Sequence, residues 1–289
     1  MSGVEIGTST DRAASTAPRS GVAARLTFGG LLHAEWIKLW TLRSTYWCFL
    51  IAVALTVGFG FLVAVAISST GLGDTGSRPG ATSALAQAAT GGTSIAELVV
   101  AVLGALIVTG EYGTGMIRTT FLAAPRRFDA LGAKALVFVL VAFGVGIVAV
   151  AISTGIAIAV VTGAGLHPDL GEPGLWGALL GGAGALALVG LLAVGIGMLV
   201  RNSAFAITLS VGILFVLPII MSILSGVTQA HWVTDLIAYL PSQAASTMSS
   251  YDPHGLTSSL DPWQAALVLG LWAGVFVGLG VLAAERRDA

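Results

Sequence analysis

Six long runs of apolar residues, almost free of charged side chains, dominate this sequence. The runs occupy residues 47–69, 94–110, 135–161, 175–200, 203–224 and 263–284. A helix needs about 20 apolar residues to cross the ~30 Å hydrocarbon core of a bilayer, whereas barrel strands are shorter and alternate in polarity. Only 9% of the residues are charged, against roughly 25% in a soluble domain. The sequence therefore predicts an all-α integral membrane protein, with six transmembrane helices across residues 47–284.

The basic residues predict the orientation of these helices. The connections alternate between two sides of the membrane, and 12 of the 13 Lys and Arg residues fall on one side. Arg78 is the exception. Because positive charge is retained in the cytoplasm, we expect both termini to be cytoplasmic. Residues 1–25 lack apolar periodicity and are predicted to be a disordered tail, and residues 285–289 form a second, short tail.

Residues 26–46 are predicted to form an amphipathic helix on the membrane surface. One arc of its helical wheel is apolar and the opposite arc is polar. The apolar arc holds Leu32, Trp36, Ile37, Leu39 and Trp40, and the polar arc holds Glu35, Lys38 and Thr41. Tryptophan favours the headgroup region, and Glu35 and Lys38 have the i, i+3 spacing of an ion pair. The alternative is that this stretch is only the polar flank of the first span.

Residues 111–134 form the longest polar, basic stretch between two spans. The segment holds Glu111, Arg118, Arg126, Arg127 and Lys134. It exceeds 20 residues, which is long for a simple connection. Within it, the apolar stretch 116–124 is compatible with a short helix. The segment is predicted to contact a soluble partner, although its basic residues could also serve only to enforce the orientation.

The sequence offers little material for catalysis. It contains no G-x-x-x-x-G-K-[ST] phosphate loop and no H-E-x-x-H motif. Its four histidines are scattered, and Cys48 is its only cysteine, which excludes an intrachain disulfide. We therefore expect a protein that is not an enzyme, with no catalytic, cofactor-binding or metal-binding residue and no nucleic-acid partner.

Two residues inside the spans are candidates for a cargo path or a gate. Glu97 is the only ionisable residue clearly within a span. It precedes Glu111 by 14 residues, or about 21 Å of helix, which predicts a position near the outer interface. Its alternative role is that of a solvated or pore-facing residue. Pro218 is expected to kink the fifth span, either as a hinge or as a static bend.

Glycines at four-residue spacing predict close helix packing. Gly270, Gly274 and Gly278 lie in the sixth span, and Gly177 and Gly181 lie in the fourth. Small residues at this spacing allow two membrane helices to approach closely, within one chain or between two subunits.

Three stretches resemble the permease subunits of type-2 ATP-binding-cassette exporters, in particular those of actinobacteria. They are AEWIKLWTLRSTYW before the first span, TGEYGTGMIRTTFLAAPRR after the second, and YLPSQAASTM between the last two. Together with six spans, the resemblance covers nearly the whole chain after residue 25. It implies a bacterial cytoplasmic membrane protein and short outer helices within the outer segment 225–262.

The resemblance also implies the partners. Residues 34–43 would be the connecting helix, and the stretch after Glu111 would be a coupling helix docked on a separate ATPase subunit that binds ATP and magnesium. The residues expected at that contact are Glu111, Met116, Ile117, Arg118, Phe121, Leu122, Arg126 and Arg127. Two permease chains, identical or different, would assemble with two ATPases.

The expected function is export of an amphipathic or lipophilic cargo by alternating access, powered by the ATPase. Two alternatives remain open. The chain could be a non-transporting membrane anchor or assembly subunit for a soluble partner. It could also be an ion-coupled carrier, which predicts buried charges and broken helices near the middle of the membrane.

Overall fold

The computed structural model describes residues 27–69, 80–116, 127–251 and 260–286, and this part of the chain contains helices and no strand. Six helical segments are long and apolar enough to cross a membrane. They are α2 (Arg43–Ser69), α3 and α4 together (Ala81–Thr90 and Thr93–Thr114), α6 (Arg127–Gly163), α7 (Pro173–Val200), α8 to α9 (Ser203–Thr228) and α12 (Pro262–Arg286). The protein is an all-α, multi-pass membrane protein, as the apolar runs predicted.

Helix α7 is the centre of the bundle. It packs against α4, α6, α8 and α12, and most of its residues are buried. Glycine and alanine make this possible, because small side chains let neighbouring backbones approach. A Cβ atom on Gly195 would lie 2.5 Å from the backbone nitrogen of Val277 in α12. The contact between α7 and α12 therefore requires a glycine at this position.

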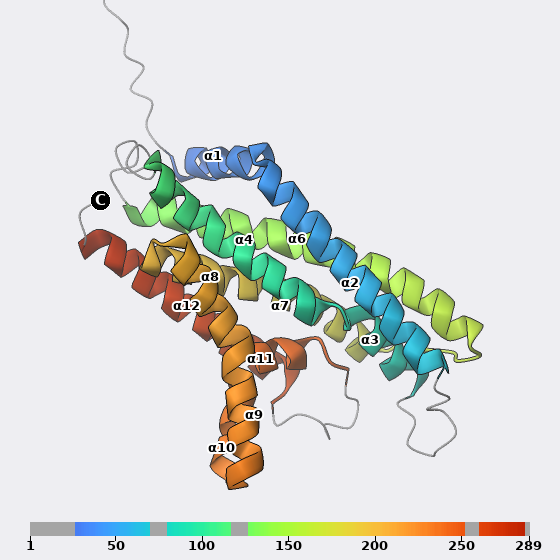
Figure 1. Cartoon of the computed structure of the whole chain (residues 1–289). Coiled ribbons are helices and arrows are strands. Elements are labelled where there is room, and N and C mark those ends of the chain that lie inside the picture. The colour runs from blue at the N-terminus through green and yellow to red at the C-terminus, as the bar shows by residue number, and fades with distance from the viewer. Residues whose placement is uncertain (1–26, 70–79, 117–126, 252–259, 287–289) are drawn as a thin grey trace, which may run out of the picture.

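Helix α1 (Phe28–Thr41) lies across one end of this bundle (Figure 1). The Thr27 hydroxyl caps its first turn by accepting a hydrogen bond from the Gly30 amide at 3.3 Å. The chain turns at Leu42, whose backbone is extended, and α2 begins at the next residue. The same end of the bundle holds the last turns of α4, the first turns of α6 and the end of α12.

Two helical segments extend beyond the predicted spans. The connection after the first span was expected to be a loop as far as about Ser94, but α3 occupies Ala81–Thr90 and seven of its ten residues are buried. Its polar residues are compatible with burial because their hydroxyls bond to backbone carbonyls, as Thr90 does to Ala86. Helix α6 starts at Arg127, before the predicted third span at residue 135.

The fifth span leaves the bundle. It consists of α8 (Ser203–Val211), a π-helical turn at Gly212–Val216, and α9 (Leu217–Thr228), in which no residue is buried. Pro218 lies two residues after this turn and lacks the backbone N–H that would bond to the carbonyl four residues earlier in a regular helix. In Figure 1, α9 and the following α10 (His231–Ala238) stand away from the other helices.

Two short helices, α10 and α11 (Pro241–Met248), precede α12, as the resemblance implied for segment 225–262. The second of them packs on α7 and α12. Its carbonyl at Met248 lies so close to Gly181 that a Cβ atom there would overlap it. In contrast, Cβ atoms on Gly270, Gly274 and Gly278 would meet no described atom within 4 Å, so this glycine motif is not a packing seam within the described part of the chain.

Candidate functional site

Four charged side chains meet where α1 crosses the bundle, and we call Glu35, Lys38, Glu111 and Lys134 the four-charge cluster. The Lys134 ammonium group donates to Glu35 Oε2 at 2.6 Å and to Glu111 Oε1 at 2.8 Å. Lys38 donates to Glu35 Oε1 at 2.8 Å and to Glu111 Oε1 at 3.1 Å. Each lysine therefore bridges the same two carboxylates, and the four charges cancel.

The helices place these residues from three distant parts of the chain. Glu35 and Lys38 lie on one face of α1, and their predicted i, i+3 ion pair is confirmed. Glu111 lies in the last turn of α4, which ends at Gly115 with a positive φ of 73°. Lys134 lies about two turns into α6. The cluster thus joins the surface helix to the helices on either side of residues 115–126.

Burial makes these charges depend on one another. Lys134 is 3% exposed, Glu35 is 6% exposed and Glu111 is 8% exposed. A buried charge is tolerated when it is paired and hydrogen-bonded, and removing one partner leaves the other uncompensated. The cluster is therefore an obligatory contact between α1, α4 and α6, since each buried member requires its neighbours.

The pKa values of the two α1 residues follow from these contacts. Burial alone would raise the pKa of the Glu35 carboxyl, but Lys134 and Lys38 outweigh it, and the pKa is lowered. Burial would likewise lower the pKa of Lys38, but Glu35 and Glu111 raise it. Both groups are therefore held in their charged forms around neutral pH.

One carboxylate oxygen of the cluster is left without a hydrogen bond. Oε2 of Glu111 is buried and has no partner among the described residues. A cavity of about 340 Å³ adjoins the cluster, with the four charged residues and Leu39, Leu103 and Ile107 among its lining. The hydrogen bonding of Glu111 is therefore incomplete on the side of the cluster that adjoins this cavity.

A second contact holds the end of α4 from its other side. The guanidinium group of Arg201, in the turn between α7 and α8, lies 5.0 Å from the centre of the Tyr112 ring. The same guanidinium donates to the backbone carbonyl of Ala283 in α12 at 3.2 Å. Glu111 and Tyr112 are consecutive, so the end of α4 is tied to α1 and α6 through one residue and to α7, α8 and α12 through the next.

The structure changes the assignment of two residues expected to face outward. Glu111 was expected in the contact with a soluble partner, but it lies inside the four-charge cluster. Glu35 belongs to the predicted polar arc of α1, yet its side chain is buried against Lys134, whereas Thr41 of the same arc is exposed. Trp36 and Trp40 keep about half their surface exposed, as a membrane-surface helix requires.

The remaining predicted contact residues are only partly described. Met116 is 48% exposed at the end of α4. Arg127 begins α6, and its side chain is outside the described part of the structure. Ile117, Arg118, Phe121, Leu122 and Arg126 lie outside the described residues, as does the predicted tail 1–25.

Glu97 is deeper in the protein than its predicted position near the outer interface suggested. It is 6% exposed, and we find no hydrogen bond or ion pair to it within the described residues. Ala96 and Val100, which flank it in α4, belong to the main apolar core. Glu97 is therefore a largely buried acid beside the apolar core.

The buried pairing of Lys134 was not predicted from the sequence. This lysine was grouped with the basic residues of segment 111–134, because a lysine before an apolar run is typical of a membrane anchor. The sequence offered one signal for this cluster: two glutamates and two lysines lie in the short segments that flank the spans. Comparison with models of known protein families and with curated proteins finds no match to this sequence.

Proposed function

We propose that this chain is the membrane-spanning permease subunit of an ATP-driven exporter. The observation that supports this function is the four-charge cluster, which links the surface helix α1 to both helices that flank residues 115–126. A soluble partner that moves this segment would act directly on α4 and α6. Such a link is useful in a machine driven from outside the membrane, and unnecessary in a passive anchor.

The end of α4 is the proposed point of force transmission. Displacing it would move α1 and α6 through Glu111, and α7 and α12 through Tyr112 and Arg201. Rigid-body shifts of packed helices are a common way to switch between two arrangements. In this proposal they alternately open the path for an amphipathic or lipophilic cargo to the two sides of the membrane.

The proposed partners follow from this mechanism. A separate ATPase subunit binds ATP and magnesium and docks on the segment through Met116, Ile117, Phe121 and Leu122. Arg118, Arg126 and Arg127 add charge to that contact. A second permease chain completes the cargo path, and the bacterial cytoplasmic membrane holds the assembly with both termini in the cytoplasm.

A pull-down from mild detergent tests the proposal. With this chain as bait, we expect ATPase activity to co-purify. Replacing the nine residues 116–124 by a Gly/Ser linker of equal length should abolish it. The matched control is the same replacement of the nine residues 252–260, on the opposite side, which should retain the ATPase.

Two results would contradict this function. One is a folded bait that captures no ATPase under any mild extraction. The other is an ATPase that stays bound and active in transport after charge reversal at both Arg118 and Arg126, which would remove these residues from the proposed contact.

Glu97 favours a second candidate, an ion-coupled carrier. An ionisable residue inside a membrane helix often marks an ion or proton path, because the hydrocarbon penalises its charge. Transport in vesicles distinguishes the two candidates. A carrier would run on an imposed ion gradient without nucleotide, whereas the exporter would require ATP and would continue when the gradient is collapsed.

A further inference from the structure

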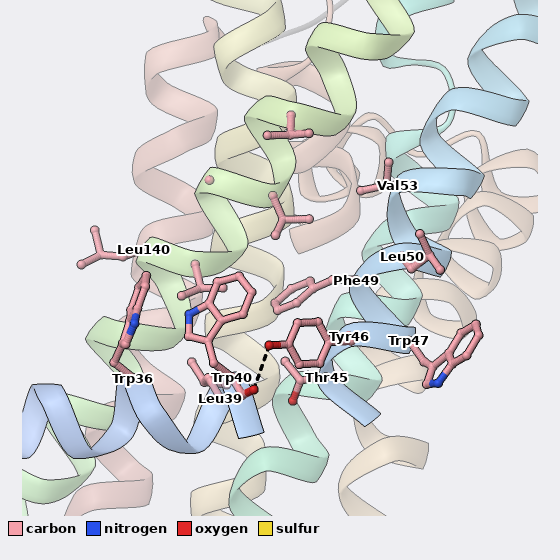
Figure 2. Close-up of a pocket in the computed structure, with 14 residues that line it drawn as sticks. Trp36, Leu39, Trp40, Thr45, Tyr46, Trp47, Phe49, Leu50, Val53 and Leu140 are labelled. Carbon is pink, nitrogen blue, oxygen red and sulfur yellow. Dashed lines mark hydrogen bonds between the residues drawn. The ribbon is translucent and has the colours of Figure 1, made fainter. Parts of the chain in front are cut away.

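An apolar cavity of about 790 Å³ lies between α1, α2 and α6 (Figure 2). Its volume is within the range of ~300–1,000 Å³ that is common for small-molecule sites. The lining comes from three helices: Trp36, Leu39 and Trp40 of α1, Thr45, Tyr46, Trp47, Phe49, Leu50 and Val53 of α2, and residues 140, 141, 144, 145 and 148 of α6. We call it the aromatic cavity.

Aromatic rings build one wall of this cavity. The Trp36 and Trp40 rings are 5.7 Å apart, and the Trp40 and Tyr46 rings are 5.4 Å apart. The Tyr46 hydroxyl donates to the Trp40 carbonyl at 2.8 Å, as the dashed line in Figure 2 shows. This bond fixes the turn between α1 and α2, so the wall is a preformed part of the fold.

The four-charge cluster keeps the cavity from closing. Glu35 and Lys38 hold α1 to α4 and α6, while Trp36 and Trp40 line the aromatic cavity on the same helix. For α1 to collapse into the space, buried ion pairs would have to break. Filling the space with another molecule instead restores the dispersion contacts that an empty cavity lacks.

The position of the aromatic cavity limits what can enter it. Leu50, Leu140 and Val148 lie on spanning helices and are each more than half exposed, so this side of the cavity faces the lipid. The α1 side lies at the end of the spans, where tryptophan and tyrosine prefer the headgroup region. A molecule that enters is therefore one that already sits in the leaflet, with an apolar chain at the level of α2 and α6 and a polar part at the level of α1.

Four polar groups of the aromatic cavity's lining have no hydrogen-bond partner among the described residues. The indole N–H groups of Trp36, Trp40 and Trp47 donate no hydrogen bond to any described residue, whereas Trp176 and Trp272 donate to backbone carbonyls. Thr45 is 4% exposed, and its buried hydroxyl also has no partner in the described structure. These three tryptophan side chains are 45–64% exposed, so their indole N–H groups are open to acceptor oxygens of a ligand at the rim of the cavity.

We propose that the aromatic cavity binds a phospholipid from the leaflet on the α1 side. One acyl chain occupies the space between α2 and α6. The phosphate and ester oxygens accept hydrogen bonds from the indole groups. Apolar contact alone does not favour binding of the acyl chain, because the cavity and the bilayer interior are similarly apolar. The hydrogen bonds at the rim and the preformed shape are what retain this lipid.

Lipid retention by a cavity-filling variant tests the proposal. A Cβ atom on Gly144 would meet nothing within 4 Å, so Gly144→Leu fills the cavity without a backbone clash. The matched control is Gly155→Leu, at an equally open and exposed glycine of the same helix that is not part of the lining. Each full-length protein is reconstituted in vesicles of phosphatidylcholine and phosphatidylglycerol and extracted in detergent. The phospholipid retained per chain is then counted by native mass spectrometry.

We expect the wild type and Gly155→Leu to retain about one phospholipid per chain more than Gly144→Leu. The double variant Trp36→Phe, Trp40→Phe keeps the cavity apolar but removes two donors, and should release that phospholipid several-fold faster. Equal retention by wild type and Gly144→Leu would overturn the proposal. So would a loss of self-association in Gly144→Leu without a loss of lipid, since the cavity would then be an interface between copies. If Gly144→Leu does not fold, Val148→Trp provides a second way to fill the space.

Discussion

The Lys134 ammonium nitrogen lies 2.6 Å from a carboxylate oxygen of Glu35, a residue 99 positions earlier in the chain. Both residues are more than nine-tenths buried, so neither can exchange its partner for water. The contact connects the surface helix α1 to the third membrane span. Glu111 completes the link to the second span, and the three helices therefore behave as one unit at this end of the bundle.

Lys134→Met should destabilise the protein strongly. The substitution keeps much of the side chain's length but leaves Glu35 and Glu111 with Lys38 as their only cation. Removing one partner of a buried ion pair typically lowers the free energy of unfolding by about 3–5 kcal/mol. Thermal unfolding in detergent should therefore show a clear fall in Tm relative to the wild type.

Lys38→Met is the matched control for this prediction. It removes the same charge from the same cluster, but the Lys38 side chain is 30% exposed against 4% for Lys134. The Tm of Lys38→Met should therefore fall less than the Tm of Lys134→Met. The double variant Glu35→Gln, Lys134→Met should lose less than the sum of its single variants, and strict additivity would show that the two residues are not coupled.

The lowered pKa of Glu35 predicts a pH-dependent stability. A carboxyl group whose pKa is lower in the folded state stabilises the fold above its ordinary pKa of 4.5, and this stabilisation is lost as the pH falls through the folded value. The gap in Tm between wild type and Glu35→Gln should be constant from pH 8 to pH 6 and shrink below about pH 4.5. The control is Asp235→Asn, at an exposed acid of α10, whose Tm should equal that of the wild type across the same pH range. If the difference in Tm between wild type and Glu35→Gln grew as the pH fell, the pKa of Glu35 could not be lowered in the folded state.

Hydropathy was sufficient to predict the six spans, because lipid requires long apolar helices and the charged residues of this chain cluster between them. It did not predict α3, since Ala, Ser and Thr are too weakly apolar to resemble a span. Burial of Thr90 depends on its hydroxyl bonding to Ala86 and Ser249, and the second contact is made by a residue 159 positions away. Sequence patterns alone do not show such contacts.

The candidate site was predicted only in part for the same reason. The pairing of Glu35 with Lys38 is local and follows from helical spacing. The pairing of Glu35 with Lys134 depends on how three helices pack, so the sequence presented Lys134 as one more basic anchor. Likewise, the spacing of Gly270, Gly274 and Gly278 indicated a packing seam, while the glycine that meets α12 most closely is Gly195, outside any such motif.

Gly181→Ala should destabilise the protein, whereas Gly177→Ala should not. A Cβ atom on Gly181 would overlap the Met248 carbonyl, so α7 and α11 would have to separate. Forcing extra atoms into a packed interior typically costs about 1–3 kcal/mol. A Cβ atom on Gly177, one turn earlier on the same helix, meets nothing within 4 Å. The Tm values of the two variants should therefore differ, and equal values would mean that α11 does not pack on α7 as described.

Glu97→Gln should leave the Tm unchanged or raise it. The residue is 6% exposed and has no described partner, so the substitution removes no hydrogen bond or ion pair. It also removes an ionisable group from a membrane helix, where charge is penalised. A marked fall in Tm would reveal a stabilising partner for this acid. With the fold intact, transport by the variant becomes informative: ATP-driven export that survives Glu97→Gln removes this acid from the transport cycle. Loss of transport at unchanged Tm would place it in the path of the cargo or of a coupled ion.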